Sequence, residues 1–455
     1  MTTPSGAPAS APPSRGRLLQ ILGVGFGVAV AVGNTIAAGI VRTPGEIARH
    51  LPSVWLFLGV WVGAAVYALL SAAQLAELGA AIPRSGGQYN YSRRALGEYA
   101  GFIVGWSDWL STCGTCAAVG IVIGEYSGDL LPALQGHVKA IAVFVILLFA
   151  ALQFRSLRAG SLIQNVSSLL KCLAFFVVVA ACFFFGKGAP AAGAPAALAI
   201  PQGWPLFAGL VLGLQATIYS FDGWDGVIYF GDEVRDPARG VPRSIYGSVL
   251  SIFAIYLLIN AAVVWVLPMR EIAGNNFALG AAAQRVFGAY GDTVIRSVMV
   301  LSLLSSLNAL HLMGTRVIYA MARGGLFFRS VAAVNKGGTP TLALLLSAAV
   351  GVLFAIFDFQ RVIAMLAFFF VTNYTLSFVA LFVLRKREPE MARPYRAWGY
   401  PWTTGAALAG SALFLAGAIQ SDLENSRWTL VALAASYPVF RTLKWAARRS
   451  ARDAA

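Results

Sequence analysis

Residues 33–45 read GNTIAAGIVRTPG and lie within one of the longest apolar runs of the chain. Gly33, Gly39, Pro44 and Gly45 form helices poorly, so a helix that crossed a membrane here would be weak near its centre. An unsatisfied backbone group in hydrocarbon costs several kcal/mol. We therefore expect a broken helix at this position, and we expect its free backbone groups to have a binding role.

The rest of the chain has the composition of a membrane protein. Of its 455 residues, 58% are hydrophobic and 12% are charged, whereas about 25% of residues are charged in ordinary globular proteins. A membrane-spanning helix needs about 20 mostly apolar residues, and runs that suit such helices recur along the whole length. Because these runs are continuous rather than alternating, they predict an all-α polytopic membrane protein and exclude a β-barrel.

Twelve transmembrane helices are predicted from these runs. They cover residues 19–43, 53–80, 98–126, 138–154, 162–186, 206–230, 244–267, 296–322, 340–357, 361–384, 401–420 and 428–445. Residues 1–18 are rich in Pro, Ala and Ser, which predicts a disordered N-terminal tail, and they show no cleavable signal pattern. Residues 446–455 form a short C-terminal tail.

The net charge of +15 is explained by membrane topology. If both termini are cytoplasmic, the cytoplasmic segments contain 23 of the 34 Lys and Arg residues, the outer loops contain 9, and two lie within spans. Such an excess on the inner side is the usual orientation signal. We expect a multi-pass protein of the cell (inner) membrane whose basic loops contact lipid, and no nucleic-acid partner.

A second interruption occurs in the sixth predicted span, where residues 216–226 read ATIYSFDGWDG. Each interruption lies in the first span of a block of five, spans 1–5 and spans 6–10. Because five is an odd number, the second block enters the membrane in the opposite direction to the first. Paired broken helices in two inverted repeats mark the binding site of many transporters. The pattern predicts one repeat over 19–186, an inverted repeat over 206–384, and two further spans over 401–445.

The broken ends suit an α-amino acid, which carries a carboxylate and an ammonium group. Half-helices present partial positive charge on their first N–H groups and partial negative charge on their last carbonyl groups. Small residues such as Gly33 and Gly39 also allow close packing of helices, which is the structural alternative. Under the binding interpretation, the carboxylate is bound by the N–H groups of Ala37, Ala38 and Gly39, and the ammonium group by carbonyls near Ile36, Tyr219 and Ser220.

Five stretches resemble the amino acid–polyamine–organocation superfamily, and within it the L-type amino acid transporter branch. They are GNTIAAGIVRTPG (33–45), AELGAAIPRSGGQYNY (76–91), YSFDGWDGVIYFGDEVRDPARGVPRSI (219–245), NALHLMGTRVIYAMARGG (308–325) and RPYRAWGYPW (393–402). The resemblance implies the LeuT-type fold, a 5+5 inverted repeat with spans 1 and 6 broken. The chain departs from the family at Ala37-Ala38-Gly39, where Gly-Ser-Gly is usual, so backbone donors remain but a hydroxyl is lost.

Ionisable residues within spans are costly and usually functional. Lys171 lies in the fifth span, and family members that do not use sodium often have a lysine there. The resemblance implies that its ammonium group takes the place of a sodium ion, contacts the first span and contributes to coupling, including by exchanging a proton. The alternative is a lysine that extends to the lipid headgroups.

Asp222 and Asp225 flank Gly223-Trp224 in the second interruption. Asp222 is left open between contact with a substrate cation, proton transfer and stabilisation of the broken helix, while Asp225 is expected to stabilise the structure. Both residues suit a helix N-terminus. Of the neighbouring aromatic residues Tyr219, Phe221 and Trp224, we expect Tyr219 to gate the site.

Further polar residues are expected to act as gating or structural groups. Asn308 in span 8 either lines the site or forms a hydrogen bond between helices. Glu233 and Arg243, in the loop after span 6, are predicted to form an ion pair that closes the inner side. Arg316, Asp108 and Glu77 are expected to have structural roles.

These patterns predict a secondary active amino-acid transporter, a permease that works by alternating access. Coupling is either proton symport or amino-acid exchange, and the expected substrates are neutral L-amino acids. A transporter of cationic amino acids or polyamines, and a sensor that binds without translocation, remain alternatives. We expect no enzyme, because no catalytic set assembles. We also expect no metal, cofactor or obligatory protein partner.

Overall fold

The computed structural model describes residues 22–155, 157–186, 199–335 and 338–452. These residues form sixteen α-helices and three short 3-10 helices, and their strand-like pairings are two isolated bridges. In chain order the elements are α1 (Val24–Thr35), α2 (Ala38–His50), α3 (Val54–Ala81), α4 (Tyr89–Leu96), α5 (Glu98–Leu130), η1 (Pro132–Leu134), α6 (Val138–Arg155), α7 (Leu157–Phe185), α8 (Trp204–Phe221), η2 (Gly226–Glu233), α9 (Pro237–Val266), α10 (Met269–Ile272), α11 (Ala278–Phe287), α12 (Gly291–Arg323), η3 (Arg329–Ala332), α13 (Thr341–Phe354), α14 (Phe359–Arg387), α15 (Trp402–Ser421) and α16 (Leu423–Arg452).

The helices confirm a polytopic, all-helical membrane protein. Six continuous helical segments are long and apolar enough to cross a membrane. They are α3, α8 with η2, α9, α12, α14 and α15. The bent pair of α1 and α2 adds a seventh. Ten of the twelve predicted spans each fall on one helix, while 19–43 falls on α1 and α2, and 206–230 on α8 and η2. The membrane crossing of the remaining helices and the inverted repeat stay predictions.

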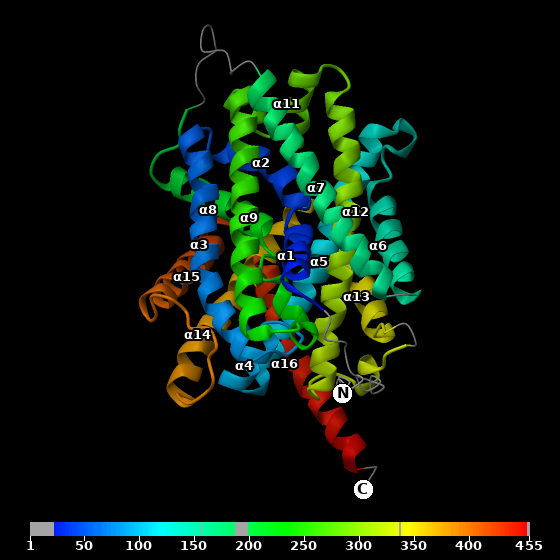
Figure 1. The fold of residues 1–455 in the computed structure, drawn as a ribbon, viewed down its shortest axis with the longest axis vertical. Coiled ribbons are helices and arrows are strands. Elements are labelled where there is room, and N and C mark those ends of the chain that lie inside the picture. Colours follow the sequence, from blue (N-terminus) through cyan, green and yellow to red (C-terminus); the bar gives the residue numbers. More distant parts are fainter. Residues whose placement is uncertain (1–21, 156, 187–198, 336–337, 453–455) are drawn as a thin grey trace, which may run out of the picture.

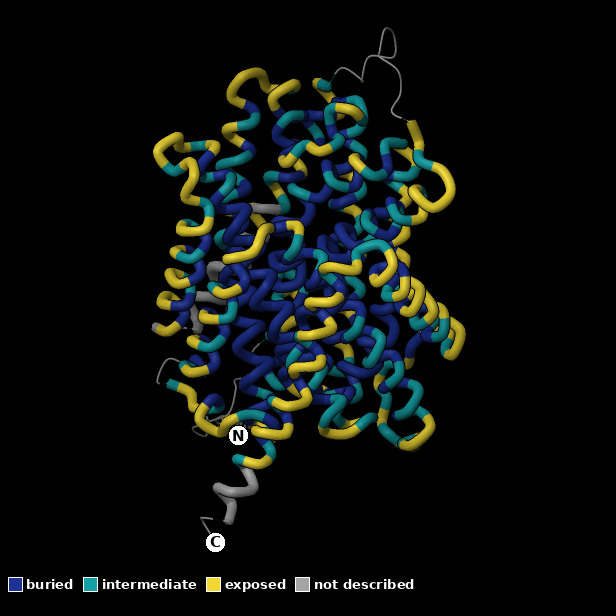
Figure 2. The backbone as a smooth tube through the Cα atoms, turned by 180° about the vertical axis from the view of Figure 1, so that it is seen from behind, coloured by how far each residue is buried: buried dark blue, intermediate teal, exposed yellow. Residues whose placement is uncertain are grey.

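The bundle is built around α5, which contacts α6, α12, α13 and α14 (Figure 1). We call the end of the molecule at which α16 ends the lower end, and the end that contains α11 the upper end, as drawn in Figure 1. Buried residues fill the middle of the bundle, while exposed ones lie on its flanks and at its ends (Figure 2). Large apolar side chains such as Phe144, Phe176 and Phe184 are exposed, as expected of helices that face lipid.

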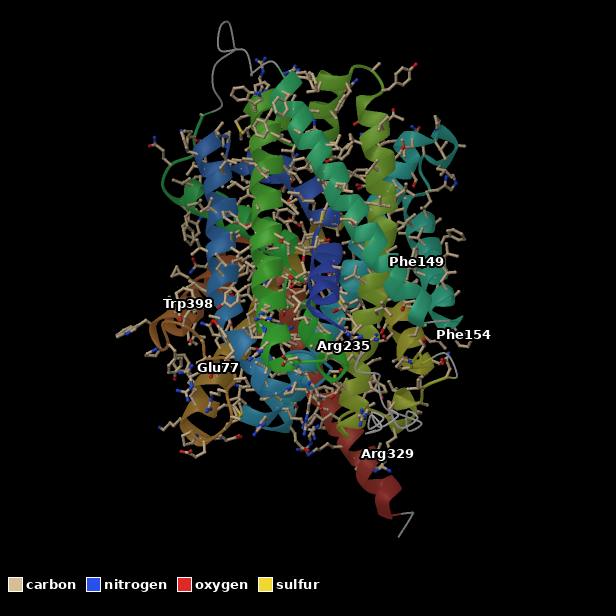
Figure 3. The ribbon with its side chains drawn as sticks, in the orientation of Figure 1. Glu77, Phe149, Phe154, Arg235, Arg329 and Trp398 are labelled. Atoms are coloured by element: carbon tan, nitrogen blue, oxygen red, sulfur yellow. The ribbon has the colours of Figure 1, made fainter. Side chains whose placement is uncertain are left out.

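Arg235 and Arg329 lie toward the lower end of the molecule (Figure 3). Glu77, at the end of α3, is fully buried there. It forms ion pairs with Arg385 and Arg393, and it accepts a hydrogen bond from the Ala397 N–H at 2.7 Å. These contacts attach the loop after α14 to α3, in agreement with the structural role expected of Glu77.

The first predicted interruption is present. α1 ends at Thr35, α2 begins at Ala38, and their axes differ by 44°. The non-helical residues are Ile36 (φ −76°, ψ 76°) and Ala37 (φ −129°, ψ −141°). Pro44, one of the residues that suggested a break, lies within α2.

The second interruption separates α8 from η2. α8 ends at Phe221, and Asp222 has extended geometry with φ −57° and ψ 144°. Gly223 follows with φ +101°, a left-handed conformation that glycine adopts without steric cost. The chain then forms the 3-10 helix η2 from Gly226. FDGWDG therefore breaks the span because Gly223 permits a turn that an L side chain would resist.

Candidate functional site

The two breaks lie against each other. A Cβ atom added to Gly39, at the start of α2, would lie 2.6 Å from Cα and 2.7 Å from Oγ of Ser220 in α8. A Cβ atom on Gly223 would overlap the side chain of Asn34 and lie 3.0 Å from Oγ1 of Thr35. Glycine is thus required at both points of contact, because its lack of a side chain lets the two backbones approach.

A pair of hydroxyl groups joins the two broken helices. Thr43 Oγ1 lies 2.9 Å from Ser220 Oγ. Each hydroxyl also lies within hydrogen-bond distance of a carbonyl in its own helix, Thr43 of Gly39 at 2.7 Å and Ser220 of Ala216 at 2.8 Å. Each hydroxyl has one hydrogen to donate, so when one of them donates to the other, its own helix carbonyl is left without that donor. Since all of these atoms are buried, the contact holds the start of α2 in a defined position on the end of α8.

The carbonyl ends of α1 and α8 share one donor. The hydroxyl of Tyr256 in α9 lies 2.6 Å from the carbonyl oxygen of Thr35 and 2.8 Å from that of Ser220. Tyr256 is fully buried, and its ring packs edge-on against Trp61 and Phe221, with centroid distances of 5.5 and 5.1 Å. A phenol has one hydrogen to donate, so the two carbonyls compete for it.

Not all of the N–H groups that were predicted to bind the substrate carboxylate are available for it. The Ala37 N–H donates to the Thr35 carbonyl at 2.8 Å, so it belongs to the break itself. α2 begins at Ala38, and the first N–H groups of a helix have no partner within it. Ala38 and Gly39 therefore carry the donors that point out of the helix start, with the partial positive charge that favours an anion there.

Aromatic and charged side chains cover the upper side of the breaks. Tyr219 is buried and meets the ring of Phe359 in α14 edge to face at 6.0 Å. The guanidinium of Arg42 lies 5.3 Å from the centroid of the same ring. Arg42 also forms an ion pair with Glu125 of α5 at 2.6 Å. The gating role of Tyr219 stays a prediction.

Two carboxylates of the second break accept hydrogen bonds from neutral donors. Asp222 accepts from the Tyr374 hydroxyl at 3.0 Å, and the ring of Tyr374 stacks on Trp224 at 5.6 Å. Asp225 accepts from Gln88 Nε2 at 3.0 Å. Asp225 precedes η2 but makes no capping bond to it, so its bond to Gln88 attaches the break to the segment before α4.

A third carboxylate, which is buried, lies on α5. Asp108 accepts from the Tyr229 hydroxyl of η2 at 2.7 Å. This bond joins the second half of the broken span to the central helix of the bundle. It agrees with the structural role expected of Asp108.

An ion pair closes the lower side, with a partner different from the one predicted. Both guanidinium ends of Arg316 in α12 meet Glu233, at 2.9 and 3.3 Å, and the side chains are 6% and 7% exposed. Arg243, the predicted partner, is exposed at the start of α9 and takes no part in this pair. Arg316 also lies 4.5 Å from the centroid of the Phe230 ring.

The residue Leu22, just before α1, forms hydrogen bonds with the segment that contains Glu233. Leu22 donates to the carbonyl of Glu233 at 2.9 Å and accepts from the N–H of Arg235 at 3.0 Å. The sequence could not identify these partners, because they come from segments about 200 residues apart. Together with the Glu233–Arg316 pair, they fix both broken spans at the lower end.

Two of the predicted site residues, Asn308 and Lys171, are not seen at the contact between the breaks. Asn308 is buried, and its side-chain and backbone oxygens accept from Gln153 Nε2 of α6 at 3.0 and 2.6 Å. Asn308 therefore joins α12 to α6. Lys171 belongs to α7, but its side chain lies outside the described part of the structure.

Comparison with known proteins assigns the family. A sequence profile of the amino acid permeases matches residues 18–437. The chain belongs to this amino acid permease family. The resemblance to the amino acid–polyamine–organocation superfamily is thereby confirmed, and the permease is an amino acid transporter of the multi-pass membrane type.

Relatives of the permease have transport functions in their names. It is 26% identical to the serine/threonine exchanger SteT of Bacillus subtilis over 434 residues, which cover 94% of the permease and 97% of the exchanger. It is 27% identical to the mouse Asc-type amino acid transporter 1 over 394 residues, covering 83% and 73% of the two chains. An uncharacterised transporter of Mycobacterium tuberculosis is 32% identical over 364 residues, 79% of each chain.

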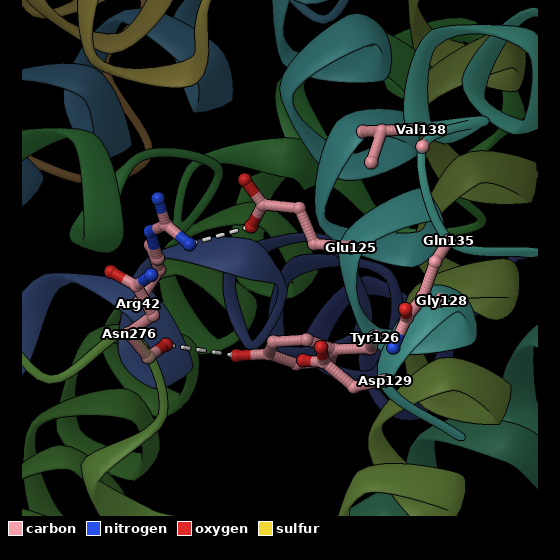
Figure 4. A pocket seen from close by; sticks show the side chains of 9 residues that line it. Arg42, Glu125, Tyr126, Gly128, Asp129, Gln135, Val138 and Asn276 are labelled. Atoms are coloured by element: carbon pink, nitrogen blue, oxygen red, sulfur yellow. Dashed lines mark hydrogen bonds and ion pairs between the residues drawn. The ribbon is translucent and has the colours of Figure 1, made fainter. Parts of the chain in front are cut away.

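A cavity opens at the upper end of the permease (Figure 4). Its volume is about 270 Å³. Arg42 and Glu125 face each other on one wall, and Tyr126 donates to the Asn276 carbonyl at 3.3 Å on another. The cavity therefore begins one helical turn beyond Gly39, on the side of the breaks opposite the Glu233–Arg316 pair.

Proposed function

We propose that the permease is a secondary active transporter that exchanges neutral L-amino acids by alternating access, with substrate bound between the two breaks. The observation that carries this proposal is the bond of Tyr256 to both carbonyl ends. Two buried carbonyls that converge on one hydrogen form an acceptor pair, and an ammonium group has three hydrogens to offer. The substrate carboxylate is then bound by the start of α2, at Ala38 and Gly39.

The closed lower end supports alternating access. The Glu233–Arg316 pair and the contacts of Leu22 hold both broken spans together at that end, while the cavity beside Arg42 lies at the other. In this proposal the structure is closed toward the cytoplasm. The positions of Arg235 and Arg329 at the lower end agree with an inward-facing basic side and with cytoplasmic termini.

Exchange is favoured as the coupling mode by the likeness to the serine/threonine exchanger SteT over nearly the whole chain. In this reading Lys171 replaces a coupling ion, and twelve spans include the 5+5 inverted repeat of the LeuT-type fold. Proton symport is the alternative that the same lysine allows.

A cationic amino acid is the second candidate substrate, and Asp222 is the observation that favours it. Its half-buried carboxylate accepts a hydrogen bond from the neutral Tyr374 hydroxyl and lies at the break itself. A basic substrate side chain that reached Asp222 would gain a charge-assisted hydrogen bond.

Uptake into liposomes tests the proposal. Reconstituted protein is given labelled neutral or cationic amino acids, with and without internal amino acid and with and without an inward proton gradient. Neutral uptake that requires internal amino acid supports exchange. Gradient-driven uptake into empty liposomes would establish symport instead, and binding without any uptake would favour a sensor.

A further inference from the structure

The cavity at the upper end carries charges of both signs. Its lining includes the guanidinium of Arg42, on α2, and the carboxylates of Glu125 and Asp129, near the end of α5 (Figure 4). We propose that this vestibule is a second amino-acid site, in which Arg42 binds the carboxylate of the zwitterion and Glu125 and Asp129 bind its ammonium group. The proposal takes the identity of its ligand from the proposed function.

The size of the vestibule suits a small zwitterion. Its volume of about 270 Å³ is roughly nine times the ~30 Å³ that one water molecule occupies in the liquid. Pockets for drug-sized ligands begin at about 300 Å³. The vestibule is therefore large enough for an amino acid with a short side chain.

The charged groups are held in place by ion pairs that leave them able to bind more. Glu125 Oε2 meets Arg42 Nη1 at 2.6 Å, and Asp129 Oδ2 meets Arg296 Nη1 at 2.7 Å. A guanidinium has five donors and a carboxylate about four acceptor positions, so each group can add a ligand without losing its present partner. The Asp129 side chain is 57% exposed and therefore accessible to an incoming ammonium group.

Arg296 fixes the position of Asp129. Besides Asp129 it binds Asp292 at 2.9 Å, and it lies 4.7 Å from the ring centroid of Phe277 and 5.0 Å from that of Tyr126. This arginine is thus clamped from several sides, with its side chain 13% exposed. Preorganised charges of this kind bind a ligand with less loss of side-chain freedom.

Arg42 connects the vestibule to the layer above the breaks. It lies three residues after Gly39, and its guanidinium also covers the ring of Phe359, which meets Tyr219. A ligand carboxylate that draws Arg42 toward the vestibule weakens its contact with Phe359. Docking in the vestibule therefore precedes the movement of Phe359 and Tyr219 that admits substrate to the breaks.

The test is equilibrium binding of labelled L-serine to the purified full-length protein in nanodiscs, with kinetics of uptake measured in parallel. The vestibule variant is Asp129→Asn. Its matched control is Glu424→Gln, because Glu424 is 68% exposed and pairs with Arg361 at 2.6 Å outside the cavity. A second variant, Gln135→Trp, fills the cavity from an exposed loop position and leaves every charge in place.

We expect wild-type protein and the Glu424→Gln control to bind two serines per chain, one more weakly. Both vestibule variants should lose the weaker site, retain the tighter one, and show a KM raised about tenfold, which corresponds to about 1.4 kcal/mol of lost binding free energy. L-Lactate, which has a hydroxyl in place of the ammonium group, should fail to compete at the weaker site.

Single-site binding by the wild type, or a weaker site unchanged in both variants, would overturn the vestibule proposal. These outcomes are separate from the test of the proposed function. Active exchange with one bound serine refutes the vestibule alone, whereas two bound serines without any uptake refute the transport proposal alone.

Discussion

The hydroxyl of Tyr256 lies 2.6 Å from the carbonyl oxygen of Thr35, the residue at which α1 ends. The same hydroxyl lies 2.8 Å from the carbonyl oxygen of Ser220 at the end of α8. One side chain of α9 therefore joins the two half-helices that approach each other inside the bundle. Helix ends buried away from water need such partners, because their last carbonyls have none within the helix.

Tyr256→Phe should destabilise the substrate-free protein. The change removes the hydroxyl that donates to the Ser220 carbonyl, while the Thr35 carbonyl keeps the Ala37 N–H as a donor. An unsatisfied buried acceptor costs about 1–3 kcal/mol. If an ammonium group binds these carbonyls, saturating amino acid should restore part of the lost thermal stability. Thermal unfolding with and without substrate measures both effects.

The control for this prediction is Tyr246→Phe, ten residues earlier on α9. The Tyr246 hydroxyl binds that of Tyr395 at 2.7 Å, away from the breaks. An equal loss of stability in the two variants, with no recovery by substrate in either, would show that Tyr256 has a packing role only.

Gly39→Ala should stop transport. The added Cβ would meet backbone and side-chain atoms of Ser220 at 2.6–2.8 Å, and overpacking of this kind costs about 1–3 kcal/mol. Gly59→Ala on α3 is the matched control, since its Cβ would meet nothing within 4 Å. Initial uptake rates at equal protein content compare them, and unchanged uptake by Gly39→Ala would contradict the close contact of the breaks.

Glu233→Gln should favour opening at the lower end. The change leaves the Arg316 guanidinium buried without its carboxylate, and breaking a buried pair in this way costs about 3–5 kcal/mol. A cysteine at Ser244, which is 1% exposed and lies against Gly27, reports the opening through its rate of thiol labelling.

We expect the Ser244→Cys thiol to be labelled faster when it is combined with Glu233→Gln. Its labelling rate should not change when it is combined with Glu388→Gln, which alters a surface pair with Arg94. Equal labelling in the two backgrounds would mean that the Glu233–Arg316 pair does not hold the lower end closed.

Lys171→Ala should abolish or strongly slow transport while the protein remains folded. The prediction follows from the family resemblance, in which this ammonium group takes the place of a coupling ion. Uptake in liposomes, together with gel filtration of the variant, measures it. Wild-type rates in a folded variant would remove the proposed role of Lys171.

The breaks themselves were predictable from the sequence, because glycine, proline and aspartate residues that cluster within an apolar run weaken the helix locally. GNTIAAGIVRTPG and FDGWDG therefore located both interruptions. At the first one, Ile36 and Ala37, rather than the glycines, are the residues that leave helical geometry.

The partners of the breaks were not predictable from local patterns. Tyr256 is one aromatic residue in an apolar span, and nothing near it in the sequence indicates a hydrogen-bonding role. Glu233 has basic residues nearby in the chain, which suggested Arg243, yet it pairs with Arg316, 83 residues away. Such contacts depend on how helices distant in the chain pack together.

Exchange of neutral amino acids is tested most directly with purified protein in liposomes, by measuring uptake of labelled L-serine with and without internal unlabelled L-serine. We predict rapid uptake only when internal amino acid is present, and loss of that uptake in Gly39→Ala but not in Gly59→Ala. Equal uptake into empty liposomes, or an active Gly39→Ala variant, would contradict exchange through the paired breaks.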